Sequence, residues 1–377
     1  MTGGGWHPAL HTRLCDLVGI EYPIVQTGMG WVAGPGLVAA TSEAGGLGIL
    51  AAATMSMDEL RAGIGEVKDR TGKPFGVNLR ADQADVGERI DLLIRERVKV
   101  ASFAMAPQEP LIRRLRDAGV VVIPSIGARR HAEKVAAWGV DAVLVQGGEG
   151  GGHTGQVPTS LLLPQVVDAV DIPVVAAGGF FDGRGLVAAL AYGADGIAMG
   201  TRFLLTSDSS VPDAVKQAYL ARTVTDTVVT TQVDGVPHRV LRTPLVEELE
   251  ESGPLVGTGR ALMNAVRFQR MSHQPWSSMV REGWAMHRSQ ELSLRQVVMA
   301  ANTPMLLKAA MVDGRPDLGV MASGQVVGLI DDLPSCAELI GRIMADADRV
   351  LRRLAGGGEV TSGTGQARRA GVGGQPG

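Results

Sequence analysis

The segment of the chain best suited to chemistry is residues 146–155, Gln-Gly-Gly-Glu-Gly-Gly-Gly-His-Thr-Gly, which directly follows an apolar run. Consecutive glycines, Gly151 and Gly152 among them, let the backbone lie flat beneath a planar ligand, since no side chain holds it away. They would direct the imidazole of His153 at that ligand. A neutral histidine near pH 7 can take a proton from carbon, so the pattern predicts a catalytic base at His153. The alternative is a flexible glycine loop with an exposed histidine.

Two loops of small residues could hold a phosphate group. Residues 176–179, Ala-Ala-Gly-Gly, and 199–202, Met-Gly-Thr-Arg, each follow a short apolar run. Backbone N–H groups in such loops bind a dianion without a large positive charge on the protein. Either loop could instead be an ordinary turn that ends a strand. The predicted ligands are Ala177, Gly178, Gly179, Met199, Gly200 and Thr201.

A third glycine-rich turn, residues 28–34, imitates the fingerprint of a dinucleotide-binding fold. That fold also needs an acidic residue at the end of its second strand, whereas residues 50–54 here read Leu-Ala-Ala-Ala-Thr. We therefore interpret Gly28, Met29 and Gly30 as backbone that passes close to the edge of the planar ligand.

Polar side chains end three of the apolar runs, at Asn78, Ser125 and Gln146. Amide and hydroxyl groups at these places could form hydrogen bonds with the polar edge of a bound ring system. Each of them could also merely cap a loop.

The elements that must position these residues follow from the apolar pattern. Short apolar runs alternate with longer amphipathic stretches, which is typical of repeated βα units around a parallel sheet. Eight such runs match a closed (β/α)₈ TIM barrel better than an open sheet, and the barrel places His153 and both phosphate loops at one end. The predicted strands are residues 24–26, 47–51, 75–78, 100–103, 120–124, 142–146, 174–177 and 196–199, with helices at 57–68, 88–97, 111–117, 132–138 and 185–191.

The repeat stops at Phe203, and the following sequence is richer in Arg, Met and Trp. We predict a mostly helical insertion after strand eight that covers the mouth of the barrel, with one β-like piece at 227–233 before a turn at Asp234-Gly235. The predicted divisions are residues 1–206 for the barrel, 207–304 for the insertion, 305–354 for a return to the barrel with a closing helix at 336–354, and 355–377 for a disordered tail.

Composition narrows the choice of partners. A net charge of −3 gives no reason to expect nucleic acid, and no apolar run reaches the roughly 20 residues that span a bilayer. The two cysteines, Cys15 and Cys336, are too few for a disulfide framework, which fits a cytoplasmic protein, as does an N-terminus without an apolar leader. The oligomeric state stays open, and a homo-oligomer is possible.

No metal site is expected, because the cysteines and histidines show no metal-binding spacing. Four histidines are interpreted as surface or packing residues: His131, His238, His273 and His287. The chain also has neither a GxxxxGK[ST] loop nor a GxSxG elbow, which argues against P-loop phosphoryl transfer and α/β-hydrolase chemistry.

These motifs resemble those of the nitronate monooxygenase or 2-nitropropane dioxygenase-like flavoproteins, a family that includes FMN-type enoyl-thioester reductases. Residues 146–155 are similar to the family signature QGxExGGHxG, and the likeness covers residues 22–205 and 323–330, where Gly324-Gln325 matches a second motif. The resemblance implies FMN as cofactor and His153 as the base. The FMN contacts that it carries over are Met29, Asn78, Gln146, Gly178, Gly179, Gly200 and Thr201, with Gln325 added from the second motif.

Residues 26–34, 178–184 and 301–306 look more like one subgroup, the flavin dehydrogenases of bacterial steroid (cholesterol) catabolism that act on a hydroxylated methyl-indanone carboxyl-CoA thioester. This likeness implies α,β-dehydrogenation of an acyl-CoA. His153 would remove the proton beside the thioester while hydride leaves the β-carbon for the flavin, and NAD(P) or oxygen would receive the electrons.

A CoA substrate needs cations for its phosphates and an apolar pocket for its rings. The candidate substrate contacts are Trp31, Arg239, Arg242, Arg267, Arg270 and Trp276, with Arg281, Met279 and Trp284 as further candidates. The arginines could instead lie on solvated helix faces, and the tryptophans and the methionine could belong to the core.

Three rival functions remain open at this point. A nitronate monooxygenase would oxidise alkyl nitronates with oxygen, and an enoyl-thioester reductase would run the hydride transfer in the opposite direction. A flavin-free phosphate-binding barrel, such as a lyase or a sugar-phosphate isomerase, would be colourless.

Overall fold

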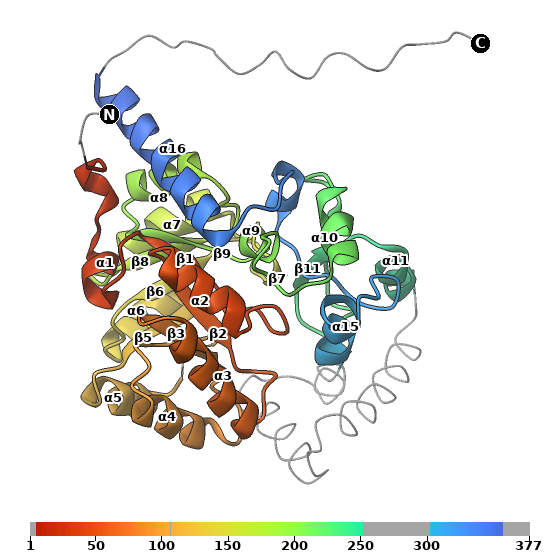
Figure 1. Cartoon of the computed structure of the whole chain (residues 1–377), viewed down its shortest axis with the longest axis horizontal. Helices are drawn as coiled ribbons and strands as arrows, with labels where there is room; N and C mark the ends of the chain where they lie inside the picture. The colour runs from red at the N-terminus through yellow and green to blue at the C-terminus, as the bar shows by residue number, and fades with distance from the viewer. Residues whose placement is uncertain (1–4, 106, 252–301, 357–377) are drawn as a thin grey trace.

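The computed structural model describes residues 5–105, 107–251 and 302–356. Its centre is a closed barrel of eight parallel strands in the order β1-β2-β3-β4-β5-β6-β8-β9, so the predicted (β/α)₈ TIM barrel is confirmed (Figure 1). Every predicted strand is present, and the bounds differ by at most two residues. The barrel strands are β1 (Ile24–Gln26), β2 (Leu47–Ala51), β3 (Phe75–Leu79), β4 (Val100–Phe103), β5 (Val121–Ile126), β6 (Val143–Gln146), β8 (Val174–Ala177) and β9 (Gly196–Met199).

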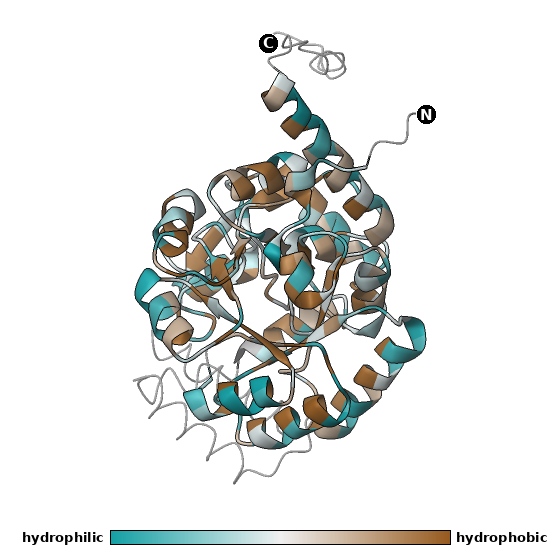
Figure 2. Ribbon diagram, turned by 90° about the vertical axis from the view of Figure 1, so that its left-hand side faces the viewer, coloured by the Kyte–Doolittle hydropathy of each residue, from teal (hydrophilic) through white to brown (hydrophobic). Residues whose placement is uncertain are grey.

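Helices follow the barrel strands on the outside. Their amphipathic sequences turn apolar residues towards the strands, so the strands are largely brown in Figure 2 while the outer helices carry both teal and brown. The third helix begins with a capping box, in which Ser56 and Glu59 satisfy each other's backbone N–H groups. These helices are α2 (Pro35–Glu43), α3 (Met57–Arg70), α4 (Val86–Arg95), α5 (Glu109–Asp117), α6 (Arg129–Ala137), α7 (Thr159–Val167), α8 (Gly183–Ala191) and the short α9 (Thr201–Leu204).

The inside of the barrel is a packed core that is closed at one end. A short 3₁₀ helix η1 (Pro8–Leu10) leads into α1 (Arg13–Val18), whose buried Leu14 and Val18 belong to the same apolar cluster as Val25, Ile49 and Leu144 of the strands. Because α1 covers the amino ends of the strands, a ligand must approach from their carboxyl ends. This is the end at which TIM barrels place their active sites.

The chain leaves the barrel after α9 and builds a second group of elements beside it. They are α10 (Asp213–Leu220), β10 (Thr227–Thr230), β11 (His238–Leu241), α11 (Pro244–Glu251) and α15 (Asn302–Met311). The expectation of a single β-like piece in this region was wrong, because β10 and β11 form an antiparallel pair across the predicted turn at Asp234-Gly235. Gly235 has φ +87°, a conformation that suits glycine.

A third strand joins this pair from the barrel. β7 (Gly152–His153) lies within the glycine-rich segment after β6 and pairs antiparallel with β11, which gives the sheet order β10-β11-β7. Figure 1 shows β7 and β11 side by side between the barrel and helices α10, α11 and α15. The small sheet therefore joins the second group of elements to the open end of the barrel.

The C-terminal part packs against the barrel. After η2 (Gln325–Leu329), the long helix α16 (Cys336–Gly356) packs on α8 and α2. The approach to α8 is close, because a side chain at Gly183 would lie 2.5 Å from the carbonyl oxygen of Ile343. None of the helices in the described ranges is long and apolar enough to cross a membrane.

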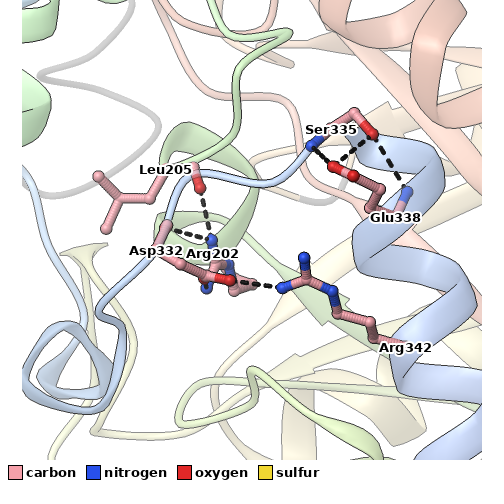
Figure 3. A network of polar contacts seen from close by, with 6 residues as sticks. All are labelled: Arg202, Leu205, Asp332, Ser335, Glu338 and Arg342. Carbon is pink, nitrogen blue, oxygen red and sulfur yellow. Dashed lines mark hydrogen bonds and ion pairs between the residues drawn. The ribbon is translucent and has the colours of Figure 1, made fainter.

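Ion pairs hold the segment between η2 and α16 against the barrel (Figure 3). Arg202 is a buried residue of α9. Its guanidinium donates to the Asp332 carboxylate at 2.9 Å and to the Leu205 carbonyl at 2.5 Å. Arg342 of α16 lies 2.5 Å from the same carboxylate. Arg202 therefore anchors this segment to the barrel.

Candidate functional site

The glycine-rich segment after β6 is folded back on itself at the open end of the barrel. Gln146 donates from Nε2 to the carbonyl oxygens of His153, at 2.8 Å, and Gly151, at 3.3 Å. Gly147 donates its backbone N–H to Ala177, which ends β8. The end of β6, the predicted base and the first predicted phosphate loop are thus joined by hydrogen bonds.

Pairing of β7 with β11 sets the position of His153. The register places His153 opposite His238 and Gly152 opposite Arg239. The two imidazole rings lie 4.7 Å apart, centroid to centroid, at an interplanar angle of 48°. His238, which we expected to be a surface or packing residue, is buried directly beside the predicted base.

Asp234, in the turn between β10 and β11, lies between the two histidines. Its Oδ2 atom is 2.7 Å from His153 Nε2 and 3.4 Å from His238 Nδ1. The carboxylate side chain is only 3% exposed, as is the His238 side chain, whereas that of His153 is 60% exposed. The cluster thus presents one accessible imidazole on a buried acidic support.

Burial acts on the two buried groups of this cluster in opposite senses. Burial would raise the pKa of Asp234, but the hydrogen bonds and charges of His153 and His238 outweigh it and hold that pKa well below its ordinary value. Burial lowers the pKa of His238, and this effect outweighs the attraction of the carboxylate. At neutral pH the cluster therefore contains an ionised carboxylate and a neutral buried imidazole.

His153, Asp234 and His238 also bring their ligand atoms within 4.8 Å of one another. A divalent cation would find two nitrogens and a carboxylate there, which is a ligand set that transition metals accept. The spacing rules that we applied to the sequence miss this set, because its members come from separate segments that only the fold brings together.

The loop of residues 176–179, the first predicted phosphate loop, packs as bare backbone against the glycine-rich segment after β6. Gly178 and Gly179 have φ +96° and +87°, and a side chain at Gly178 would lie 3.1 Å from the backbone nitrogen of Gly150. Glu149 ties the glycine-rich segment to the start of α7, since its Oε2 accepts from both the backbone N–H and the hydroxyl of Thr159. Only glycine allows these two loops to approach so closely.

The second predicted phosphate loop, residues 199–202, meets the Gly324-Gln325 motif beside the first. Thr201 accepts a hydrogen bond from the backbone of Gly324 at 3.0 Å, and the N–H of Gln325 donates to the Glu149 carbonyl at 3.0 Å. At Gly200 a side chain would lie 3.4 Å from the sulfur of Met29. The loops after β1, β6 and β9 and the segment before η2 therefore share one end of the barrel.

The loop after β1 packs against the end of β3. A side chain on Gly28 would overlap that of Asn78, whose amide donates to Ser102 at 3.3 Å. Trp31 has φ +65°, which is unusual for a residue with a side chain, and its indole N–H donates to the Pro304 carbonyl at 3.1 Å. This loop thus contacts both the barrel and α15.

The other predicted cofactor contacts lie at the carboxyl ends of β5, β8 and β9. Ser125 lies on β5 beside Leu144 of β6, and its side chain makes no hydrogen bond to another candidate within the described residues. Ala177 and Met199 are buried at the ends of β8 and β9, with side chains that belong to the core.

Arg239, a candidate for CoA phosphates, is engaged by the protein itself. Its Nε and Nη2 donate to the Gly148 carbonyl at 3.2 and 2.9 Å, and Nη1 donates to Thr227 at 3.0 Å. The guanidinium therefore fixes the glycine-rich segment. Arg242 has an exposed side chain, while Arg267, Arg270, Trp276, Met279, Arg281 and Trp284 lie outside the described residues.

Comparisons with known proteins agree with this geometry. The nitronate monooxygenase family model matches residues 11–91 and 85–346. The chain is 66% identical over 341 residues to a Mycobacterium tuberculosis protein named (3aS,4S,5R,7aS)-5-hydroxy-7a-methyl-1-oxo-octahydro-1H-indene-4-carboxyl-CoA dehydrogenase, a match that covers 90% of this chain and 96% of that protein. It is 64% identical to the Rhodococcus jostii protein of the same name, over 92% and 98% of the two chains.

Solved structures show the same likeness. FabK from Thermotoga maritima is 35% identical, with a TM-score of 0.77 over 92% of this chain and 98% of its own. Nitroalkane oxidase from Streptomyces ansochromogenes is 30% identical, with a TM-score of 0.70 over 90% and 100%. Because the family model matches most of the chain and the two dehydrogenases are 66% and 64% identical over 90% and 92% of it, the chain belongs to the nitronate monooxygenase family of flavin-dependent oxidoreductases.

Proposed function

We propose that this protein dehydrogenates an acyl-CoA thioester between its α and β carbons, with FMN as cofactor, NAD(P) as electron partner and His153 as base. The acyl group that we propose is a hydroxylated methyl-indanone carboxylate, the class named for the two relatives at 66% and 64% identity. The observation that carries the proposal is identity at this level along nearly the full length of both relatives. It is supported by an accessible His153 at the open end of the barrel.

The residues at this end suit FMN. Gly178 and Gly179 present backbone without side chains, as close approach to a phosphate requires, and Thr201 adds a hydroxyl group. Asn78, Gln146 and Met29 would border the ring system. FMN, when bound, supplies the two-electron acceptor for a hydride from the β-carbon.

His153 has the position and the exposure that a base needs. The proton beside a thioester carbonyl is acidified by that carbonyl, and an imidazole can accept it near neutral pH. Because the side chain is 60% exposed on a buried support, it can reach a substrate without moving the backbone. Loss of the proton and loss of hydride together leave an α,β-unsaturated thioester.

The test is anaerobic mixing of the purified yellow protein with a panel of CoA thioesters, while flavin absorbance is followed. A hydroxylated methyl-indanone carboxyl-CoA should bleach the flavin fastest, and addition of NAD⁺ or NADP⁺ should restore the colour. The His153→Gln variant should bleach about 10²- to 10⁴-fold more slowly, as is usual when a general base is removed.

A matched control is His131→Gln, since His131 is an exposed histidine of α6 outside the site. It should bleach at the native rate. Full-speed bleaching by the His153 variant would remove His153 from the proposal, and no bleaching with any thioester would remove the acyl-CoA.

Nitronate oxidation is the second candidate, favoured by the family match and by 33% identity to a probable nitronate monooxygenase of Staphylococcus saprophyticus over 81% of that protein. Oxygen consumption with propionate-3-nitronate, at a rate above that of thioester oxidation, would favour it. A colourless protein without flavin would contradict both.

A further inference from the structure

We propose that Asp234 and His238 form a buried positioning pair that holds His153 as the tautomer protonated on Nε2, so that Nδ1 is the atom that accepts the substrate proton. This inference rests on the proposed role of His153 as base. It adds which nitrogen reacts and what sets that choice.

The first argument is the contact between His153 and the carboxylate. An ionised carboxylate can only accept hydrogen bonds, so a nitrogen 2.7 Å from Asp234 Oδ2 must carry the proton. That nitrogen is Nε2. A neutral imidazole has one protonated nitrogen, and its lone pair is therefore on Nδ1, which makes no hydrogen bond to any described residue.

The second argument is the environment of Asp234. Its side chain is 3% exposed, and its second oxygen, Oδ1, accepts from the backbone N–H of Val236 at 3.3 Å in the same turn. A carboxylate fixed by its own turn has little freedom to rotate away from the imidazole. Such a support both orients a histidine and stabilises the cation that forms when the histidine takes a proton.

The third argument is His238. Its Nδ1 approaches the same oxygen, Asp234 Oδ2, at 3.4 Å, and its Nε2 has no partner among the described residues. The neutral, buried ring packs against the ring of His153 at 4.7 Å, centroid to centroid, and so contacts that side chain on its buried side. The β7–β11 register, which puts His153 opposite His238, makes this arrangement part of the fold.

Nitrogen NMR of the native flavoprotein labelled with ¹⁵N-histidine tests the tautomer directly and needs no activity. At alkaline pH, where histidines are neutral, His153 should show a protonated Nε2 and an unprotonated Nδ1. The signals are assigned by their loss in His153→Gln and His238→Gln. A protonated Nδ1 at His153 would overturn the inference, whatever the reaction proves to be.

Asp234→Asn tests the consequence for the rate. An amide has one acceptor oxygen where the carboxylate has two, so it cannot accept from the histidines and from the Val236 N–H at once, and without a charge it cannot balance an imidazolium. We expect kcat to fall about 10²-fold or more while KM changes little, because the group acts on the base and not on substrate binding. Asp226→Asn removes an exposed carboxylate near β10 and should keep native kinetics.

The outcomes separate this inference from the proposed function. If His153→Gln is slow and Asp234→Asn is as fast as native, His153 remains the base and the positioning pair is wrong. If His153→Gln is as fast as native, the proposed base is wrong, and the NMR result alone decides the tautomer. Flavin absorbance and thermal unfolding of each variant show whether it is folded and loaded.

Discussion

The barrel and the three-stranded sheet β10-β11-β7 are built in different ways. Apart from the closing pair β1–β9, each barrel strand pairs with the barrel strand nearest to it along the chain. The small sheet instead joins β7, from a loop of the barrel, to β10 and β11, which follow the last barrel strand. The barrel supplies the glycine-rich loops, and the small sheet sets the orientation of His153.

The difference indicates that cofactor binding and base positioning can be disturbed separately. A defect in a barrel strand should affect the whole fold, because the strands share closely packed apolar clusters with one another and with the surrounding helices. A defect where the small sheet meets the barrel should leave the fold in place and harm the reaction. Three substitutions test this division.

The largest effect is expected from Gly48→Ala in β2. A side chain there would overlap the carbonyl oxygen of Val38 in α2 and lie 2.8 Å from its Cα. Overpacking of this kind should lower the free energy of unfolding by about 3 kcal/mol, measured by urea titration. Gly65→Ala is the control, since its side chain would meet no atom within 4 Å in α3, and it should be neutral or stabilising. Equal stability of the two variants would contradict the packing argument.

A selective effect is expected from Gly151→Ala. The added carbon would lie 2.6 Å from the backbone nitrogen of Gly324 and from the carbonyl carbon of Ser323, so the segment before β7 must shift. We expect flavin reduction to slow by about 10²-fold, since a displacement of about 1 Å can have that effect. The free energy of unfolding should change much less than in Gly48→Ala. Gly155→Ala, with no neighbour closer than 3.8 Å, is the matched control. A variant that loses stability and activity in parallel would show that barrel and sheet are not separable.

The smallest effect is expected from Arg239→Lys. Lysine offers a single point of donation and cannot reproduce the paired N–H bonds to Gly148 or the bond to Thr227. Loss of these hydrogen bonds should raise the activation free energy by about 1 kcal/mol, which reduces kcat roughly fivefold. Arg315→Lys, at an exposed ion pair, should have no effect on kcat. If KM for the CoA thioester rises instead while kcat holds, Arg239 binds substrate phosphate, as the sequence suggested.

The fold was predictable because its signals are local. The apolar runs end at polar or small residues, and a parallel barrel needs only their number and spacing. The predicted bounds of β1, β2, β4, β8 and β9 match those of the structure. The divisions of the chain at 206, 304 and 354 stay predictions, as do the roles assigned to individual site residues.

The support of the proposed base, His153, was not predictable in the same way. The sequence indicates only a turn at Asp234 and a surface or packing residue at His238, because β11 is short and the glycine-rich pattern around His153 predicts a loop. Nothing local in the sequence indicates that this loop becomes a strand. The signal, an Asp-Gly turn between two short β-prone runs, predicts a hairpin but not the partner that the hairpin pairs with.

The β7–β11 pairing also has a consequence for the order of assembly. His153 and Asp234 are 81 positions apart in the chain, so their contact closes a long loop, whereas the βα units form over short separations. A refolding chain should therefore regain its helices and its barrel first. Catalytic competence should return last, in a phase of its own.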